Sequence, residues 1–153
     1  MFHIVLLEPE IPQNTGNIAR TCAVTGCKLH LIGPMAFSLD DRKMKRAGLD
    51  YWDKVFVDLY DGFADFCGKN PDANLRFFST KGKHYYHEAT YQAGDYLVFG
   101  KETAGIPEEI LSQYAEWTYR LPMRKDLRSL NLANAACAVV YEGLRQLSFP
   151  EME

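Results

Sequence analysis

Short apolar runs alternate along the chain with segments that carry helical periodicity or turn residues. The apolar runs have the length of strands, and they predict six strands, at residues 3–7, 28–32, 55–59, 75–79, 95–99 and 117–121. Helices are predicted between them, at residues 16–25, 40–47, around 63 and 108–114, and again after Asn131. Because strand and helix alternate, the pattern favours an α/β fold with a mostly parallel sheet and helices on both faces.

The stretch from Arg120 to Gln146 joins a basic loop to a helix with few polar positions. Ser129 and Asn131 stand before this helix, where a side-chain oxygen can cap free backbone N–H groups. Apolar or small residues then recur at helical spacing, at Leu132, Ala136, Val139, Val140, Gly143, Leu144 and Leu147. A helix that is apolar or small on nearly every side is usually buried on several sides. We therefore expect it to pack on its own core and on a second subunit, which predicts a homodimer through the C-terminal helix.

Composition and charge narrow the class of protein. The chain has 153 residues, 47% of them apolar and 24% charged, which fits one globular domain over residues 1–153. No apolar run is long enough to span a membrane, and the N-terminal segment predicts a strand instead of a signal peptide. Four cysteines without CxxC spacing favour structural thiols in a reducing cytoplasm. The net charge of −3 argues against a strongly basic nucleic-acid binder but allows a local basic patch.

Polar or glycine-containing loops are associated with four of the predicted strands. Ligands of parallel sheets bind beyond the carboxyl ends of the strands, so these loops are expected to lie together at one edge. They contain neither the G-x-G-x-x-G signature nor a P-loop, which argues against the usual dinucleotide and NTP sites. The loops are residues 14–20, 80–83, 100–107 and 122–131.

Three of these loops resemble the motifs of SPOUT-class RNA 2′-O-methyltransferases. They are the segment Asn14 to Arg20, the run Phe-Gly-Lys-Glu-Thr-Ala-Gly-Ile-Pro ending at Pro107, and Arg-Ser-Leu-Asn-Leu-Ala-Asn starting at Arg128. The segment Glu-Pro-Glu-Ile-Pro-Gln-Asn-Thr-Gly-Asn is similar to the small tRNA (cytidine/uridine-34 2′-O)-methyltransferase group, which modifies the wobble nucleotide. The resemblance covers almost the whole chain. It implies S-adenosylmethionine (SAM) as methyl donor, tRNA as substrate, a homodimer, and a SPOUT fold with a C-terminal deep trefoil knot.

The resemblance also implies site residues by matched position. Arg20 takes the catalytic role, while Ser129 and Asn131 hydrogen-bond the ribose or the SAM carboxylate, or cap the helix. A guanidinium stays protonated in proteins, so Arg20 is better suited to bind a phosphate and orient the 2′-OH than to act as the base. The cofactor is expected against Phe78, Thr80, Gly100, Glu102, Gly105, Ile106, Leu121, Ser129 and Leu130. RNA contacts are expected from Asn14, Arg20, Lys81, Lys83, Arg124 and Arg128.

Some residues have more than one interpretation. Many relatives have Arg at position 104, where this chain has Ala104 and therefore no guanidinium to contact a phosphate. The short basic helix carries candidates for phosphate contacts that are equally typical of a solvated helix face: Arg42, Lys43, Lys45 and Arg46. The loop after Lys83 carries side chains that either stack on an anticodon base or pack the loop: Tyr85, Tyr86 and His87. Two histidines in strands are expected to be structural: His3 and His30.

The sequence thus predicts a SAM-dependent 2′-O-methyltransferase that acts on the wobble nucleotide of tRNA. Two alternatives keep the same cofactor: methylation of another tRNA or rRNA ribose, and a SAM-binding RNA scaffold without turnover. The third alternative is an oxidoreductase with a nucleotide cofactor, but the chain lacks the glycine fingerprint of that class. No metal and no membrane partner is expected. The sequence identifies neither the tRNA isoacceptors nor a required prior base modification.

Overall fold

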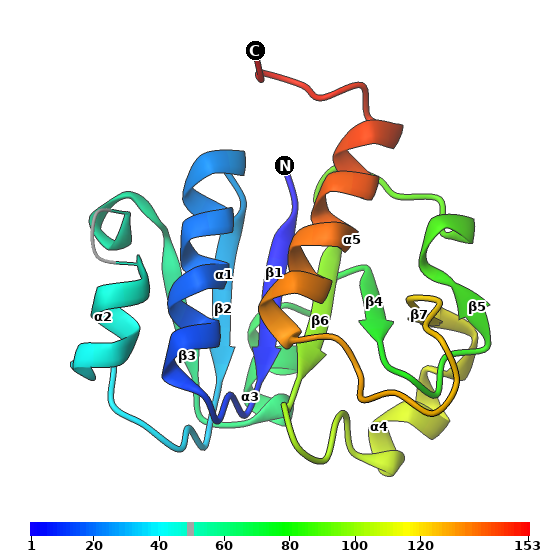
Figure 1. The fold of residues 1–153 in the computed structure, drawn as a ribbon, viewed down its shortest axis with the longest axis horizontal. Coiled ribbons are helices and arrows are strands. Elements are labelled where there is room, and N and C mark those ends of the chain that lie inside the picture. Colours follow the sequence, from blue (N-terminus) through cyan, green and yellow to red (C-terminus); the bar gives the residue numbers. More distant parts are fainter. Residues whose placement is uncertain (49–50) are drawn as a thin grey trace.

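In the computed structural model, which describes residues 1–48 and 51–153, seven strands form one sheet (Figure 1). Their order is β3-β2-β1-β6-β4-β7-β5, and all neighbouring strands are parallel. This confirms the predicted parallel sheet. The strands are β1 (His3–Leu7), β2 (Lys28–Ile32), β3 (Val57–Tyr60), β4 (Leu75–Phe78), β5 (His84–Tyr85), β6 (Tyr96–Gly100) and β7 (Thr118–Arg120).

Helices cover both faces of the sheet, as predicted (Figure 1). One face is covered by α1 (Pro12–Thr25) and α5 (Leu132–Gln146), and the other by α3 (Phe63–Lys69) and α4 (Glu108–Gln113). The short helix α2 (Arg42–Gly48) packs against α1. Among the helices of the described ranges, none is long and apolar enough to cross a membrane.

The core has two layers because successive side chains of a strand point to opposite faces of the sheet. From β1, Ile4 and Leu6 join the cluster under α1 and α5, whereas Val5 and Leu7 join the cluster under α3 and α4. All four side chains are almost fully buried. A central strand that is covered on both faces therefore reads as a continuous apolar run, which is why the sequence predicted it correctly.

The first helix is longer than predicted. It begins at Pro12, whereas the sequence pattern placed its start at Gly16. Proline suits the first helical turn because its missing N–H would have no partner there and its φ is already helical. Asn14, expected to be a loop or cap residue, therefore lies inside the helix and is buried. The predicted end is confirmed, since Gly26 follows the helix with a φ of 70°.

The sheet contains a strand that the six predicted strands do not include. This strand, β5, is two residues long and pairs with β7 at the edge of the sheet. Two residues are too few to carry a periodic signal, so the sequence pattern missed it. Short 3₁₀ helices were missed for the same reason, and the described residues contain η1 (Trp52–Lys54), η2 (Tyr86–Glu88) and η3 (Ala115–Trp117).

The carboxyl ends of β1, β6, β4 and β7 lie side by side, so the loops after them share one edge of the sheet, as predicted. At this edge, Gly100 ends β6 with a φ of 114° directly beside Leu7 of β1. A Cβ atom at Gly100 would lie 2.4 Å from the carbonyl oxygen of Leu7. Glycine is therefore required here, and it lets the chain turn sharply into the next loop.

Candidate active site

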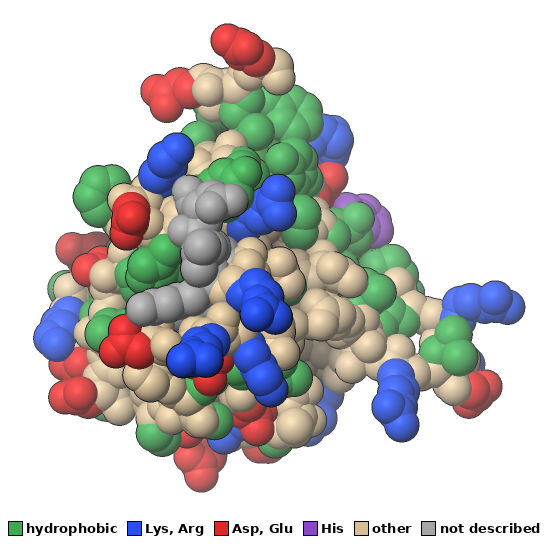
Figure 2. Space-filling view, turned by 60° about the vertical axis from the view of Figure 1, so that its left-hand side comes forward, with side chains coloured by type: hydrophobic (Ala, Val, Ile, Leu, Met, Phe, Trp, Pro, Cys, Tyr) green, Lys and Arg blue, Asp and Glu red, His purple; other side chains and the backbone are tan. Residues whose placement is uncertain are grey.

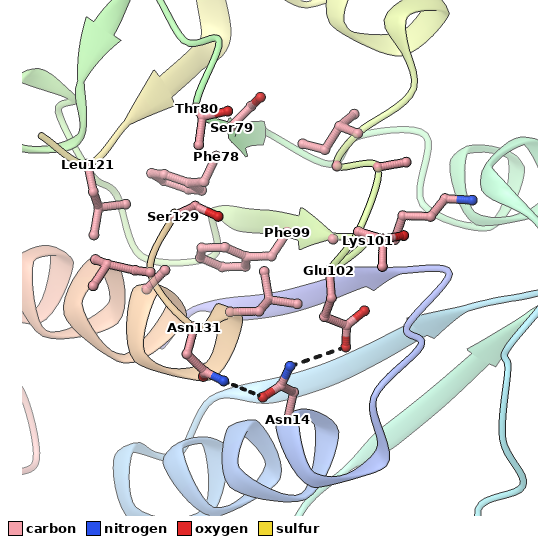
Figure 3. A pocket seen from close by; sticks show the side chains of 18 of the residues that line it. Asn14, Phe78, Ser79, Thr80, Phe99, Lys101, Glu102, Leu121, Ser129 and Asn131 are labelled. Carbon is pink, nitrogen blue, oxygen red and sulfur yellow. Dashed lines mark hydrogen bonds between the residues drawn. The ribbon is translucent and has the colours of Figure 1, made fainter. Parts of the chain in front are cut away.

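A cleft of about 580 Å³ lies at this carboxyl edge, as Figure 3 shows from close by. Three of the four predicted loops contribute residues to its lining, whereas the segment 14–20 is part of α1 and contributes Asn14 alone. They are joined by residues at the end of β4 and β6 and at the start of α5. A volume of this size is typical of sites that bury a small molecule.

Two stacked aromatic rings contribute an apolar wall of the cleft. The rings of Phe78 and Phe99 lie 4.9 Å apart between centroids and nearly parallel, and both residues are buried. Leu121, Leu130 and Ile106 add further apolar surface to the lining. Leu130 is 47% exposed, so part of this surface is open to solvent. The cleft therefore combines an apolar wall with polar loop residues, and one side of it is open to solvent.

A hydrogen-bonded network connects three of the loops across the cleft (Figure 3). The Glu102 carboxylate accepts hydrogen bonds from the backbone N–H groups of Glu10 and Ile11, at 2.9 and 3.0 Å. Asn14 donates to the same carboxylate at 3.4 Å and accepts from the Asn131 side-chain amide at 2.9 Å. Residues that are about 90 to 120 positions apart in the sequence are thereby held together.

A second set of contacts fixes the same loops on their outer side. The Glu10 carboxylate accepts hydrogen bonds from the backbone N–H and the hydroxyl of Thr103, and these bonds lower the pKa of Glu10. Lys101 forms an ion pair with Glu8 at 3.2 Å. The loop after β6 is thus attached at several points to the loop after β1, which limits how far either can move.

The residues expected to hold the cofactor all line this one cleft. They are Phe78, Thr80, Gly100, Glu102, Gly105, Ile106, Leu121, Ser129 and Leu130. The carboxylate of Glu102 already accepts hydrogen bonds from other residues of the protein, so this side chain supports the wall of the cleft. The structure thus brings the expected set together, which the sequence alone did not demonstrate.

The three residues expected to be catalytic lie in different surroundings. Ser129 and Asn131 both line the cleft. Asn131 caps α5, because its side-chain oxygen accepts from the backbone N–H groups of Ala133 and Asn134 at 2.9 and 3.2 Å. Its amide donates to Asn14, so the Asn131 side chain links the start of α5 to α1. Arg20 is exposed on α1 and does not line the cleft of its own chain.

The cations expected to contact RNA divide into two sets. Lys81 and Arg128 line the cleft, and Lys81 also pairs with Glu108 at 3.3 Å. Lys83 pairs with Glu116 at 2.7 Å outside the cleft, and Arg124 is exposed in the loop before α5. The surface ion pairs are weak, so the lysines remain available to a stronger anion.

The aromatic loop after Lys83 contains one packed ring and two exposed rings. Tyr86 is partly buried and packs on the main core cluster. Tyr85 is 38% exposed, with the guanidinium of Arg120 4.9 Å from its ring centroid. The ring of His87 lies parallel to that of Tyr85 at 5.8 Å. Tyr86 therefore packs the loop, while Tyr85 and His87 form an accessible stack.

The strand histidines belong to a buried polar cluster away from the cleft lining. His3 and His30 share a hydrogen bond between ring nitrogens at 2.8 Å, and His30 also contacts the Tyr60 hydroxyl at 2.9 Å. Burial, and then the neighbouring His3, lower the pKa of His30 to about 4. These contacts support the structural role predicted for both. Within the described residues, no group of three His, Cys, Asp or Glu side chains is arranged to hold a metal ion.

Several lining residues were not singled out from the sequence. Phe99 is the first residue of the motif that ends at Pro107, but as a buried strand residue it was not among the residues expected to hold the cofactor. Leu132 and Ala135 belong to the first turn of α5, where apolar residues were attributed to packing. Both residues follow closely after Ser129 and Asn131 at the start of the helix, and this position could have indicated that they line the site.

Comparison with known proteins places the chain in a family. The SpoU rRNA Methylase family matches residues 1–141. The tRNA (cytidine(34)-2′-O)-methyltransferase of Saccharophagus degradans is 51% identical over 150 residues, covering 97% of this chain and 97% of that protein. The protein of the same name from Escherichia coli K12 is 48% identical over 151 residues, covering 98% of this chain and 96% of that one.

Solved structures show the same relationship. One that concerns the 2-OH methylation of C/U34 on tRNA has a TM-score of 0.92 and 48% identity, and it covers 97% of each chain. An AdoMet-bound rRNA methyltransferase from Sinorhizobium meliloti has a TM-score of 0.85 and 25% identity, covering 95% of this chain and 56% of that one. Since the family match includes the strands, the loops and most of the helix that build the cleft, the chain belongs to the SpoU rRNA methylase family.

Proposed function

We propose that the protein transfers a methyl group from SAM to the 2′-OH of the wobble nucleotide, cytidine or uridine at position 34 of tRNA. The observation that carries this proposal is the cleft, in which Glu102, Asn14 and Asn131 connect three distant loops. These loops are the ones that resemble 2′-O-methyltransferase motifs. Relatives that are about half identical over nearly their full length bear the corresponding tRNA methyltransferase name.

The residues of the cleft fit SAM in size and chemistry. The stacked aromatic wall, with Leu121 and Leu130, provides apolar contact for an adenine ring. Gly100 and Gly105 line the cleft without a side chain, so a nucleoside can come close to the backbone there. The exposed Ser129 hydroxyl is placed to hydrogen-bond the ribose or the carboxylate. SAM supplies the activated methyl group when it is bound.

We assign the RNA side of the reaction to cations of the protein. The planar guanidinium of Arg20 binds a phosphate beside the target ribose through paired hydrogen bonds and orients the 2′-OH for attack. Lys81 and Arg128, which line the cleft, contact neighbouring phosphates, and Lys83 and Arg124 extend the same cationic rim. Positioning by fixed cations contributes to rate because the reacting atoms are held in line before the transfer.

The position of Arg20 supports a homodimer with composite sites. Arg20 lies outside the cleft of its own chain, so a second copy is the natural source of the arginine at each cleft. On α5, Val139, Val140 and Leu144 are fully buried in the chain's own core. Tyr141, on another side of the helix, is 41% exposed and is available to a partner. We propose that α5 of the two copies forms this contact.

The proposal includes the C-terminal trefoil knot and the cytoplasmic location expected from the sequence. The decisive experiment incubates the protein with SAM and bulk tRNA and maps the methylated nucleotide by mass spectrometry. We expect a single 2′-O-methyl group at position 34. Methylation of a different tRNA or rRNA ribose would refute the wobble assignment. SAM binding without any transfer would support the scaffold alternative, and failure to bind SAM would refute the cofactor assignment.

A further inference from the structure

Arg20 belongs to a wider group of cations, which we call the cationic face: Arg20, Arg42, Lys43 and Arg46. All four residues are exposed. Three of them lie on α2, which packs against α1, and the fourth lies on α1 itself. Figure 2 shows Lys and Arg side chains gathered on this side of the molecule. A chain with a net charge of −3 thus concentrates positive charge on one surface.

The cationic face differs in its partners from three basic residues elsewhere on the surface. Lys69, Lys83 and Arg145 each form an ion pair with a nearby carboxylate. Within the described part of the chain, no ion pair joins a member of the cationic face to a carboxylate. Asp41, directly before α2, accepts a hydrogen bond from the backbone N–H of Lys43 at 2.7 Å and so helps to begin the helix. The positive charges of this surface remain available to an anion from outside.

The order of charges along α2 works against the stability of the helix. Arg42 and Lys43 occupy its first turn, where the helix dipole favours acidic residues, and this turn contains none. Arg42 and Arg46 are four positions apart, a spacing at which like charges repel each other on the helix surface. A helix whose only task was to cover α1 would be more stable with an acid at either position. A bound polyanion would remove both penalties.

The cationic face is connected to the cleft through α1. The guanidinium of Arg20 lies 5.1 Å from the ring centroid of Tyr51, a contact that helps to fix the direction of this exposed cation. Asn14, in the cleft network, precedes Arg20 on the same helix by about 9 Å of helical rise. Because α2 packs against α1, an RNA strand that contacts Arg20 has α2 close beside it (Figure 1).

We infer that the cationic face binds the phosphodiester backbone of the substrate tRNA, beyond the nucleotide that is modified. The inference rests on the proposed function, and it adds α2 to the RNA surface. Phosphates complement this surface because each carries one negative charge and because neutralising them releases counterions. A solvated helix face, the other interpretation of these residues, would require no anion and would leave tRNA affinity unchanged.

The test uses charge reversal at two positions of α2, Arg42→Glu and Arg46→Glu. Affinity for bulk tRNA is measured by filter binding over a series of salt concentrations, and thermal unfolding is recorded for each variant. We expect each variant to weaken binding by roughly three- to tenfold at low salt. The slope of log affinity against log salt should fall by about one per lost contact. The Tm of Arg42→Glu should be equal to or higher than that of the wild type, because an acid now occupies the first turn of the helix.

The matched control is Lys69→Glu, which changes the net charge by the same amount on α3, on the other face of the sheet. It should keep the wild-type tRNA affinity and salt slope. Wild-type binding by both α2 variants would overturn the inference, as would an equal loss in Lys69→Glu, which would indicate net charge alone. Methyl transfer by the wild type is measured in parallel. Its absence would refute the proposed function separately, because the binding comparison does not depend on turnover.

Discussion

The hydrogen bond between Asn131 and Asn14 offers a quantitative test of how the cleft is held together. Two variants remove it from opposite sides, Asn14→Ala and Asn131→Ser. Serine caps helices about as well as asparagine but is too short to reach Asn14, so Asn131→Ser keeps the cap of α5 and loses only the link. A hydrogen bond of this kind contributes about 1 kcal/mol net. Asn14→Ala also loses its longer bond to Glu102, so we expect about 1–2 kcal/mol for it.

The double variant separates the link from the other effects of each substitution. Because both single variants remove the same bond, the losses in unfolding free energy should fail to add by about 1 kcal/mol. Urea unfolding of the four proteins measures this, provided that the m-values agree. If the link also holds the loops ready for the cofactor, each single variant should weaken SAM binding up to about fivefold by calorimetry. Additive losses, within about 0.5 kcal/mol, would show that the two side chains do not cooperate and would refute the role given to the network.

Three further predictions concern Arg20, the buried His30 and the proposed dimer. Arg20→Ala should lose nearly all methyl transfer while calorimetry shows little change in SAM affinity; single-turnover rates near those of the wild type would remove Arg20 from the mechanism. His30 has its pKa lowered by burial to about 4, so the unfolded chain binds the proton first. The stability associated with neutral His30 is fully present above about pH 6.5 and is lost as the pH falls toward 4. At pH 5 the unfolding free energy should be lower by about 2 kcal/mol. Urea unfolding at pH 7.5 and pH 5 should show this loss, and His30→Gln should show less of it; equal losses would place the effect elsewhere. Ala138 is only partly buried, so Ala138→Arg should give a folded monomer, seen by analytical ultracentrifugation, with little methyl transfer. Val140 is fully buried, so Val140→Glu should unfold the chain. A dimer that survives Ala138→Arg would exclude this part of α5 from the interface.

The parts of the fold that the sequence predicted correctly are those with a repeated physical cause. The central strands are covered on both faces, so each one is a continuous apolar run. The shared edge of the four loops follows from parallel strands alone. The missed features depend on a single residue or on a very short segment. One is the proline that begins α1 four residues early, and another is the two-residue strand β5.

The site was predictable in outline, but its internal contacts were not. The motif resemblance selected the residues that line the cleft, since the matched loops lie at one edge of the sheet. Nothing in the sequence indicated that Glu102 would bind the backbone of Glu10 and Ile11, because that contact spans about 90 residues. The sequence also contained no indication that Arg20 would contact Tyr51, because the two residues come together only in the folded chain. Pairwise contacts of this kind leave no periodic signal in one sequence.

The position of Arg20 leads to a sharper test of the composite site. Arg20→Ala leaves the cleft intact, whereas Ser129→Trp would fill the cleft and leave Arg20 intact, since Ser129 is an exposed lining residue. Each variant alone should be inactive. If every cleft uses the arginine of the other copy, a mixed dimer contains one site with an open cleft and an arginine. Random pairing of the two co-expressed variants makes half of the dimers mixed, so about a quarter of the wild-type activity should return. If Arg20 serves the cleft of its own chain, no site in the mixture is complete. The mixture would then stay as inactive as its parts, and the composite site would have to be abandoned.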